Sequence, residues 1–188
     1  MTAGKGSLKA ALSRGEVIVF LGDYIDRSDK PTETVRFIMW LKEAATKAGA
    51  RVITLEGNHD YFMYRFLADV KARLDAGEKV YMREAEAMAY AIAFEISGSK
   101  KTASQFSRTA GIFCARSLAS TGFFTRIARI SRLGDFGAAY KAMEESGTVE
   151  FFSGLKRVAM VDNNVFHHAF LPFMLGELEE NAVVSLLL

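Results

Sequence analysis

Two short stretches of this 188-residue chain carry side chains that could bind a metal ion or a phosphate group. The first, FLGDYIDR, spans Phe20–Arg27, and the second, LEGNHD, spans Leu55–Asp60. In the first stretch Gly22 is followed by Asp23, and Asp26-Arg27 come three residues later. In the second stretch Gly57 is followed by Asn58-His59. Carboxylate, amide and imidazole groups bind divalent ions, and the guanidinium group binds phosphate. The two stretches together predict a site for phosphate chemistry.

Each stretch ends an apolar run that is long enough for a buried strand and rich in β-branched residues. The expected strands are Glu16–Leu21 and Arg51–Leu55. Between them Thr32–Ala48 is predicted to be a helix, with Pro31 at its start and Gly49 at its end. A right-handed crossover makes such strands parallel, so both polar stretches should emerge at the same carboxyl edge of one sheet.

The motifs Gly22-Asp23-x-x-Asp26-Arg27 and Gly57-Asn58-His59-Asp60 resemble two signature blocks of the calcineurin-like metallophosphoesterases. The likeness is greatest to the phosphoprotein-phosphatase branch and its bacterial relatives, which include the symmetrical diadenosine tetraphosphatases. Asp60 in place of Glu favours the bacterial type. The resemblance implies an α/β fold, a sandwich of mixed β-sheets flanked by helices, with a helical insertion.

The resemblance also implies two divalent metal ions, for which Mn, Fe and Zn all suit the ligand types. A carboxylate must bridge such ions at a separation of about 3.5–4 Å, and Asp23 is the natural bridge. Asn58 would bind one ion through its amide oxygen. The plainer interpretation of each residue is that it belongs to a turn after a strand.

By the same resemblance His59 is the general acid that protonates the leaving alkoxide, and the carboxylate of Asp26 orients it. Arg27 would hold two phosphate oxygens in a bidentate fork. The nucleophile would be a metal-bound hydroxide. The alternative for Arg27 is a surface ion pair with Asp26.

A third block, Phe151–Pro172, is similar to the family's strand that delivers a metal-binding histidine. The match makes His168 a metal ligand and leaves His167 outside the site. Phe170 stands where the family generally has glycine, so the match departs from the pattern where the backbone turns close to the metals.

Two parts of the family pattern are missing from this sequence. An Asp-x-His block normally precedes the first motif by about twenty-five residues. Here only 22 residues precede Asp23, and they contain no Asp-x-His motif. A later histidine ligand is also missing after Pro172. We therefore expect a chain truncated at both ends that holds one ion or none, with a sheet edge that a protein partner or a second chain could complete.

The region from residue 61 to residue 150 is predicted to be a mostly helical cap. The expected helices and later strands are Ser7–Ser13, Tyr61–Ala76, Met82–Ile96, Ala103–Leu118, Arg126–Arg132 and Phe136–Glu145, then strands Lys156–Val161, Asn164–Phe170 and Ala182–Leu188. On the helix 32–48, apolar spacing predicts that Val35, Ile38, Met39, Leu41 and Ala45 pack on the sheet, and that Phe37 and Trp40 extend this face.

The segment Ser97–Gly134 contains seven basic residues and no acidic one. It could form a basic surface that attracts phosphorylated substrates. It could equally be a set of solvated helix faces, which is the usual meaning of a charge run. A nucleic-acid site is unlikely on composition, since neither a recognised motif nor interleaved aromatic residues accompany the charges.

Composition limits the remaining possibilities. A hydrophobic content of 50% supports one domain over residues 1–188, and the net charge of +2 says little about partners. Cys114 is the only cysteine, which excludes a disulfide framework. The N-terminus lacks the apolar core of a signal peptide, and no apolar run reaches the ~18 residues of a membrane span. We expect a cytoplasmic protein that does not enter the membrane.

The sequence thus predicts a metal-dependent hydrolase of phosphomonoesters, acting on a phosphoprotein or a small nucleotide. The alternative is a catalytically inactive pseudophosphatase that binds phosphate or serves as a scaffold subunit.

Overall fold

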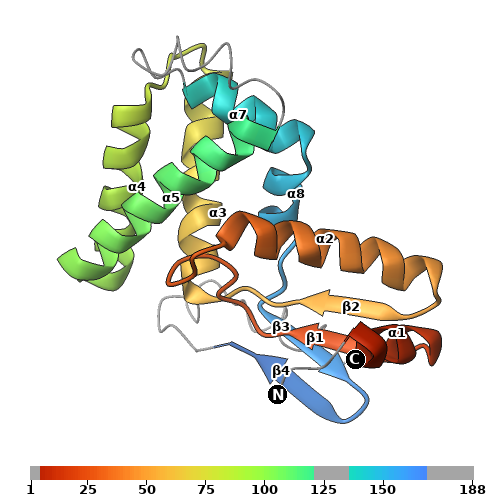
Figure 1. Cartoon of the computed structure of the whole chain (residues 1–188). Helices are drawn as coiled ribbons and strands as arrows, with labels where there is room; N and C mark the ends of the chain where they lie inside the picture. The colour runs from red at the N-terminus through yellow and green to blue at the C-terminus, as the bar shows by residue number, and fades with distance from the viewer. Residues whose placement is uncertain (1–4, 121–135, 169–188) are drawn as a thin grey trace. The chain divides into compact units, whose positions relative to one another are not determined.

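A computed structural model describes residues 5–120 and 136–168 of the chain (Figure 1). These residues form two compact units. The sheet unit contains residues 5–23, 36–58 and 155–168, and the helical unit contains residues 24–35, 59–120 and 136–154. The hypothesis of one domain stays a prediction.

In the sheet unit, β1 (Val17–Phe20) and β2 (Arg51–Thr54) are parallel neighbours, as the crossover rule predicts. Val17 is paired with Arg51 and Phe20 with Thr54. Both strands therefore end at the same edge, immediately before the two polar stretches. The short helix α1 (Lys5–Ser13) precedes β1, also as predicted.

Helix α2 (Pro31–Lys47) connects the strands and lies alongside β2 in Figure 1. Its buried apolar residues are Val35, Ile38, Leu41 and Ala45. The prediction that Phe37 and Trp40 extend this face is wrong, because their side chains are 45% and 57% exposed. At 100° per residue Trp40 lies on the side of the helix away from the buried stripe and Phe37 lies at its flank, and the two rings contact each other with centroids 5.9 Å apart.

A hairpin of β3 (Val158–Val161) and β4 (Asn164–His167) completes the described sheet unit. Its turn contains Asp162 with a φ of 53°, a conformation typical of turn residues. The backbone just before β3 pairs with the end of β2, since the Glu56 amide donates to the Lys156 carbonyl at 2.7 Å. Ile53, Leu55 and Ala159 form a buried apolar cluster in this unit.

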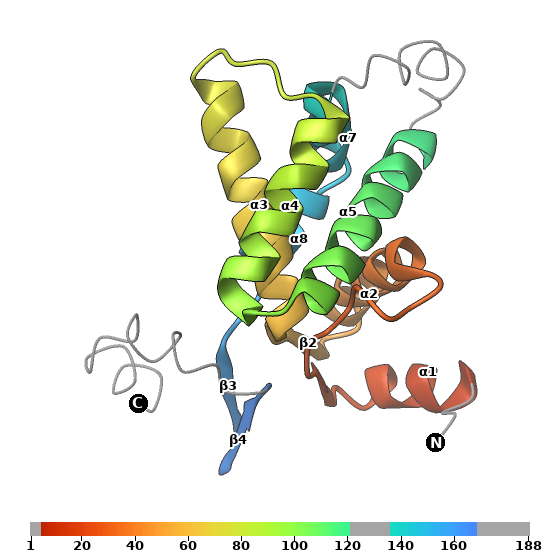
Figure 2. The same ribbon diagram turned by 90° about the vertical axis from the view of Figure 1, so that its left-hand side faces the viewer.

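The helical unit contains most of α3 (Asn58–Asp75), with α4 (Met82–Ser97), α5 (Lys100–Ser120), α7 (Phe136–Glu145) and α8 (Thr148–Ser153). Helices α4 and α5 lie side by side (Figure 2). Edge-to-face aromatic pairs join the helices: Phe62 with Phe106, Phe66 with Phe136, and Phe113 with Phe152. Such pairs add about 0.5–1.5 kcal/mol each to the burial of their surface.

The predicted helices 61–76, 82–96, 103–118 and 136–145 are confirmed, although their bounds differ, and α5 begins three residues earlier than predicted. Helix α3 begins at Asn58 rather than Tyr61, because the second motif itself forms its first turn, where Asp60 suits the helix dipole. Helix α8 was not predicted, since six residues are too few to show a helical period. The predicted helix 126–132, the predicted strand 182–188 and Phe170 lie outside the described residues.

No helix in residues 5–120 or 136–168 is both long and apolar enough to cross a membrane.

Candidate functional site

The two motif glycines bring the ends of β1 and β2 into direct contact. Gly22 has a φ of 99°, and a Cβ placed on it would lie 2.4 Å from the Gly57 nitrogen. A Cβ on Gly57 would lie 2.3 Å from the backbone nitrogen of Asp23. No other residue fits at either position, because the clashing atoms belong to the main chain and cannot move aside. Asp23 is therefore held against the second motif by backbone contact.

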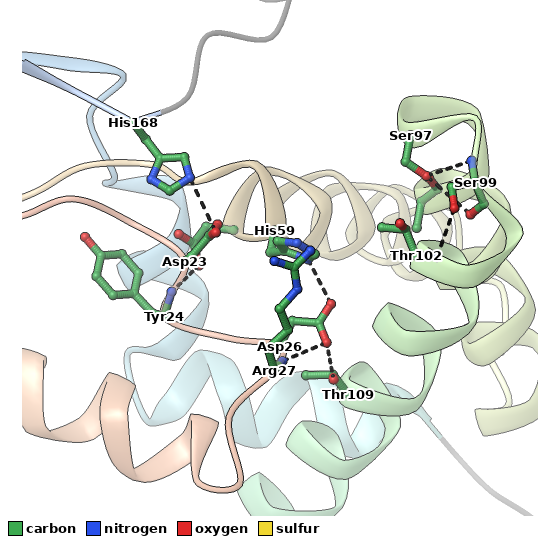
Figure 3. Close-up of polar contacts among 12 residues, drawn as sticks. Asp23, Tyr24, Asp26, Arg27, His59, Ser97, Ser99, Thr102, Thr109 and His168 are labelled. Atoms are coloured by element: carbon green, nitrogen blue, oxygen red, sulfur yellow. Dashed lines mark hydrogen bonds and ion pairs between the residues drawn. The ribbon is translucent and has the colours of Figure 1, made fainter.

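Asp23 faces His168, which extends from the end of β4 (Figure 3). Nε2 of His168 lies 3.4 Å from Oδ2 of Asp23, and Nδ1 lies 2.6 Å from the carbonyl oxygen of Leu21. A carbonyl can only accept, so Nδ1 carries a proton and donates it. In the neutral ring Nε2 then presents its lone pair to the carboxylate. The carboxylate and the imidazole nitrogen thus face each other at a separation that a cation could bridge, and a backbone carbonyl on the far nitrogen is the usual support of a metal-binding histidine.

Asn58 lies in the same unit, as the first residue of α3, and is half-buried. Asp23, Asn58 and His168 together offer carboxylate, amide and imidazole donors, which suit Mn, Fe or Zn. On donor type alone these residues suit one divalent ion. Within the described ranges no three His, Cys, Asp or Glu side chains gather at one place where they could hold a metal ion, and Asp23 with His168 makes two.

In the helical unit, Asp26 and His59 form a buried pair (Figure 3). Nδ1 of His59 lies 2.8 Å from Oδ2 of Asp26, and the two side chains are 3% and 0% exposed. Oδ1 of Asp26 accepts hydrogen bonds from the Thr109 hydroxyl at 2.9 Å and from the Arg27 amide at 3.0 Å. Oδ1 thus has two hydrogen-bond donors and Oδ2 faces His59 as an ion pair, which leaves Nε2 as the nitrogen that can exchange a proton with a substrate.

The environment keeps Asp26 ionised. Burial raises the pKa of the Asp26 carboxyl, but hydrogen bonds from His59, Thr109 and the Arg27 amide outweigh it and hold the pKa below its usual value. Asp26 and Arg27 also have positive φ angles of 65° and 50°. Residues other than glycine rarely adopt this region, and where they do they mark turns or functional sites.

Thr109 is the residue that sequence reasoning missed. It lies on α5, 83 residues after Asp26, in a segment with no motif. A weak signal was present, because Thr109 adjoins the buried stripe of Ala103, Phe106, Ala110 and Phe113 and so places a hydroxyl beside the core. Helix α5 also supports the histidine, since Phe106 packs edge-on to Phe62 and Phe62 packs edge-on to His59.

Asp60, the last residue of the second motif, fixes the loop that carries Asp26. It is fully buried, and Oδ1 accepts a hydrogen bond from the backbone amide of Tyr24 at 3.1 Å. Its position in the motif is thus explained by a structural role.

Arg27 is exposed, and its guanidinium makes no ion pair with any residue in the described part of the chain. The alternative of a surface ion pair with Asp26 is not seen, because His59 and Thr109 hold that carboxylate. His167 is also exposed. The structure thus joins Asp23 with His168 in one unit and Asp26 with His59 in the other, with Arg27 beside Asp26 in the chain.

Comparison with known families agrees with this geometry. The family model of the calcineurin-like phosphoesterases matches residues 6–172, which include both glycine motifs, the helical segment and His168. No curated protein and no solved structure matched the chain. The family fold is the α/β sandwich, which agrees with the parallel and antiparallel strand pairs and flanking helices described above, and the family hydrolyses phosphoesters with divalent metals. A match of this extent shows that the chain belongs to the calcineurin-like phosphoesterases.

Proposed function

We propose that this protein hydrolyses phosphomonoesters, with Asp26 and His59 as the general acid pair and Arg27 as the phosphate-binding residue. The observation that carries the proposal is the buried 2.8 Å contact between His59 and Asp26. A buried carboxylate against Nδ1 favours one orientation of the imidazole. A histidine with only a structural role would not need that partner together with strained backbone beside it.

In the proposed reaction water attacks phosphorus while the bond from phosphorus to the leaving oxygen breaks. His59 donates a proton from Nε2 to that oxygen, so the alcohol leaves neutral. Asp26 holds the ring through Nδ1 and stabilises its protonated form before transfer. Arg27 binds two oxygens of the phosphoryl group and orients it for in-line attack.

Asp23, Asn58 and His168 would hold a divalent ion, which when bound neutralises phosphate charge and favours ionisation of the attacking water. Mn, Fe and Zn are the candidates on ligand type. The Leu21 carbonyl supports this assignment, because it orients His168 with Nε2 toward Asp23.

For the substrate we propose a phosphoprotein or a small nucleotide, by likeness to the phosphoprotein-phosphatase branch and its dinucleotide-hydrolysing relatives. Asp60 favours the bacterial type within that branch.

The leaving group provides the test. A general acid matters most for an alkyl ester, because an alkoxide leaves poorly without a proton, and least for a nitrophenyl ester. Turnover of both esters should be measured with added manganese for the native chain, His59→Asn and the matched control His167→Ala. We expect His59→Asn to lower alkyl turnover by about 10²–10⁴-fold and nitrophenyl turnover much less, and His167→Ala to change neither.

Equal losses on the two esters would refute the acid role of His59. If the native chain binds phosphate but turns over neither ester at any metal concentration, the inactive phosphate-binding subunit becomes the better description.

A further inference from the structure

A pocket of about 440 Å³ lies within the helical unit, beside the buried acid pair. One wall is the loop after the first motif, with Arg27, Ser28 and Asp29. The other wall is one face of α5, with Gln105, Arg108 and Ile112 at helical spacing. Asp26 and Thr109 meet at this pocket and join its two walls by their hydrogen bond. Its volume lies within the range typical of small-molecule sites.

The pocket presents two cations from opposite walls. Arg27 and Arg108 are both exposed, and across the described residues neither guanidinium has a carboxylate partner. Arg108 extends from a helix and Arg27 from a loop, so a ligand between the walls can contact both. Gln105 adds amide groups, and Ile112, 44% exposed, adds an apolar surface.

The carboxylates of the pocket offset these charges only in part. Asp26 is buried and already engaged with His59, Thr109 and the Arg27 amide. Of the exposed charged groups, two are guanidinium groups and one is the carboxylate of Asp29. The open part of the pocket therefore has an excess of positive charge, which favours a ligand with more than one anionic group.

We propose that this pocket binds a small organic phosphate that carries a second anionic group, with the phosphate at Arg27 and the second anion at Arg108. This inference rests on the proposed function, which assigns the reacting phosphate to Arg27. Gln105 hydrogen-bonds the polar part of the leaving group, and Ile112 contacts its carbon chain. Arg108 is thus a specificity residue that selects the leaving group, and it takes no part in bond breaking.

Three matched esters test the assignment: propane-1,3-diol monophosphate, the corresponding bisphosphate, and 3-phosphooxypropanoate. They differ only in whether the far end carries no charge, a phosphate or a carboxylate. The variant is Arg108→Ala, and Lys101→Ala is the control, because Lys101 is an exposed cation on the same helix that does not line the pocket. Circular dichroism of each variant verifies that the helices are retained.

We expect Arg108→Ala to lower kcat/KM for the bisphosphate by about 10–100-fold and for the monophosphate by less than about 2-fold, since a charge-assisted pair is lost only with the former. Lys101→Ala should change both by less than about 2-fold. A loss on the carboxylate ester equal to that on the bisphosphate shows that any anion is accepted, and a smaller loss shows selection of phosphate. Equal losses on the charged and uncharged esters would overturn the proposal.

Binding of propane-1,3-bisphosphonate, which cannot be hydrolysed, tests the pocket assignment independently of turnover. Calorimetry should show binding to the native chain that weakens at least 10-fold in Arg108→Ala and stays unchanged in Lys101→Ala. If no ester is turned over but this pattern holds, the hydrolase proposal fails and the pocket assignment stands. If the bisphosphonate does not bind, or binds equally to Arg108→Ala, the pocket assignment is wrong whatever the activity.

Discussion

Replacing Thr109 with valine tests whether α5 holds the acid pair in position. Valine keeps the shape of threonine but lacks the hydroxyl, so Oδ1 of Asp26 would retain only the Arg27 amide as donor. The Asp26 side chain is 0% exposed, and water therefore cannot easily replace the lost hydroxyl. The substitution leaves a buried charge with one partner fewer.

The expected cost follows from the type of bond removed. A hydrogen bond to a charged group contributes about 1.5–3 kcal/mol. Thr109 itself is half-buried, so the lower end of that range applies. We expect the free energy of unfolding at pH 7 to fall by about 1.5 kcal/mol in Thr109→Val, and Thr109→Ser, which keeps the hydroxyl, to lose less than half of that.

Urea unfolding of a double-mutant cycle with Asp26→Asn isolates this one interaction. In the Asp26→Asn background Thr109→Val should cost less than about 0.5 kcal/mol, because the charged acceptor is gone. Thr102→Val, on the same helix and also half-buried, controls for loss of a hydroxyl elsewhere on α5. The reasoning is refuted if Thr109→Val costs the same with and without the Asp26 carboxylate.

Three further predictions concern acid stability, the metal ligands and the glycine contact. The pKa of Asp26 lies below its usual value in the folded chain, so its ionised carboxylate stabilises the fold above about pH 4. This contribution is lost as the pH falls through the pKa that Asp26 has in the folded state. The destabilisation caused by Asp26→Asn, measured by urea unfolding, should accordingly shrink below about pH 4, and a difference that stays constant down to pH 2 would contradict it. His168→Ala should weaken manganese binding by about 10-fold or more in calorimetry, whereas His167→Ala should not, and equal effects would exclude His168 as the ligand. Gly57→Ala should lower the free energy of unfolding by about 3 kcal/mol or more, because its Cβ would lie 2.3 Å from a backbone nitrogen. The control Gly111→Ala lies in a helix and faces only a flexible side chain at 3.3 Å, so it should be neutral or stabilising. Similar effects of the two substitutions would show that the close approach at Gly57 is absent.

Much of the sheet unit follows from local sequence alone. The runs before Asp23 and Asn58 have the length and β-branched content of strands, and Pro31 and Gly49 bound the helix between them. Chirality then makes the strands parallel neighbours. The glycines of both motifs also have a local signature, although the reason for them, a backbone contact between Gly22 and Gly57, became visible only in three dimensions.

The side-chain directions were harder to predict where an aromatic residue lay near an apolar stripe. Phe37 and Trp40 are hydrophobic and close to the buried face of α2, yet both are exposed. Hydrophobicity favours burial, but the helical angle decides which side chains reach the sheet. The sequence also allowed an ion pair between Arg27 and Asp26. That pair does not form, because His59 and Thr109 contact the carboxylate of Asp26 instead.

The sequence by itself determined the types of reactive side chain in this protein, their order after two strands, and hence the family. Only the tertiary structure decided how those residues are supported and what surrounds them. Thr109 and Arg108 lie on a helix with no motif, more than eighty residues from Asp26, and their contribution depends on how α5 packs against the loop after the first motif. Strand order and turn chemistry are written in neighbouring residues, whereas a hydrogen bond between distant segments depends on the packing of every helix between them, which no local pattern encodes.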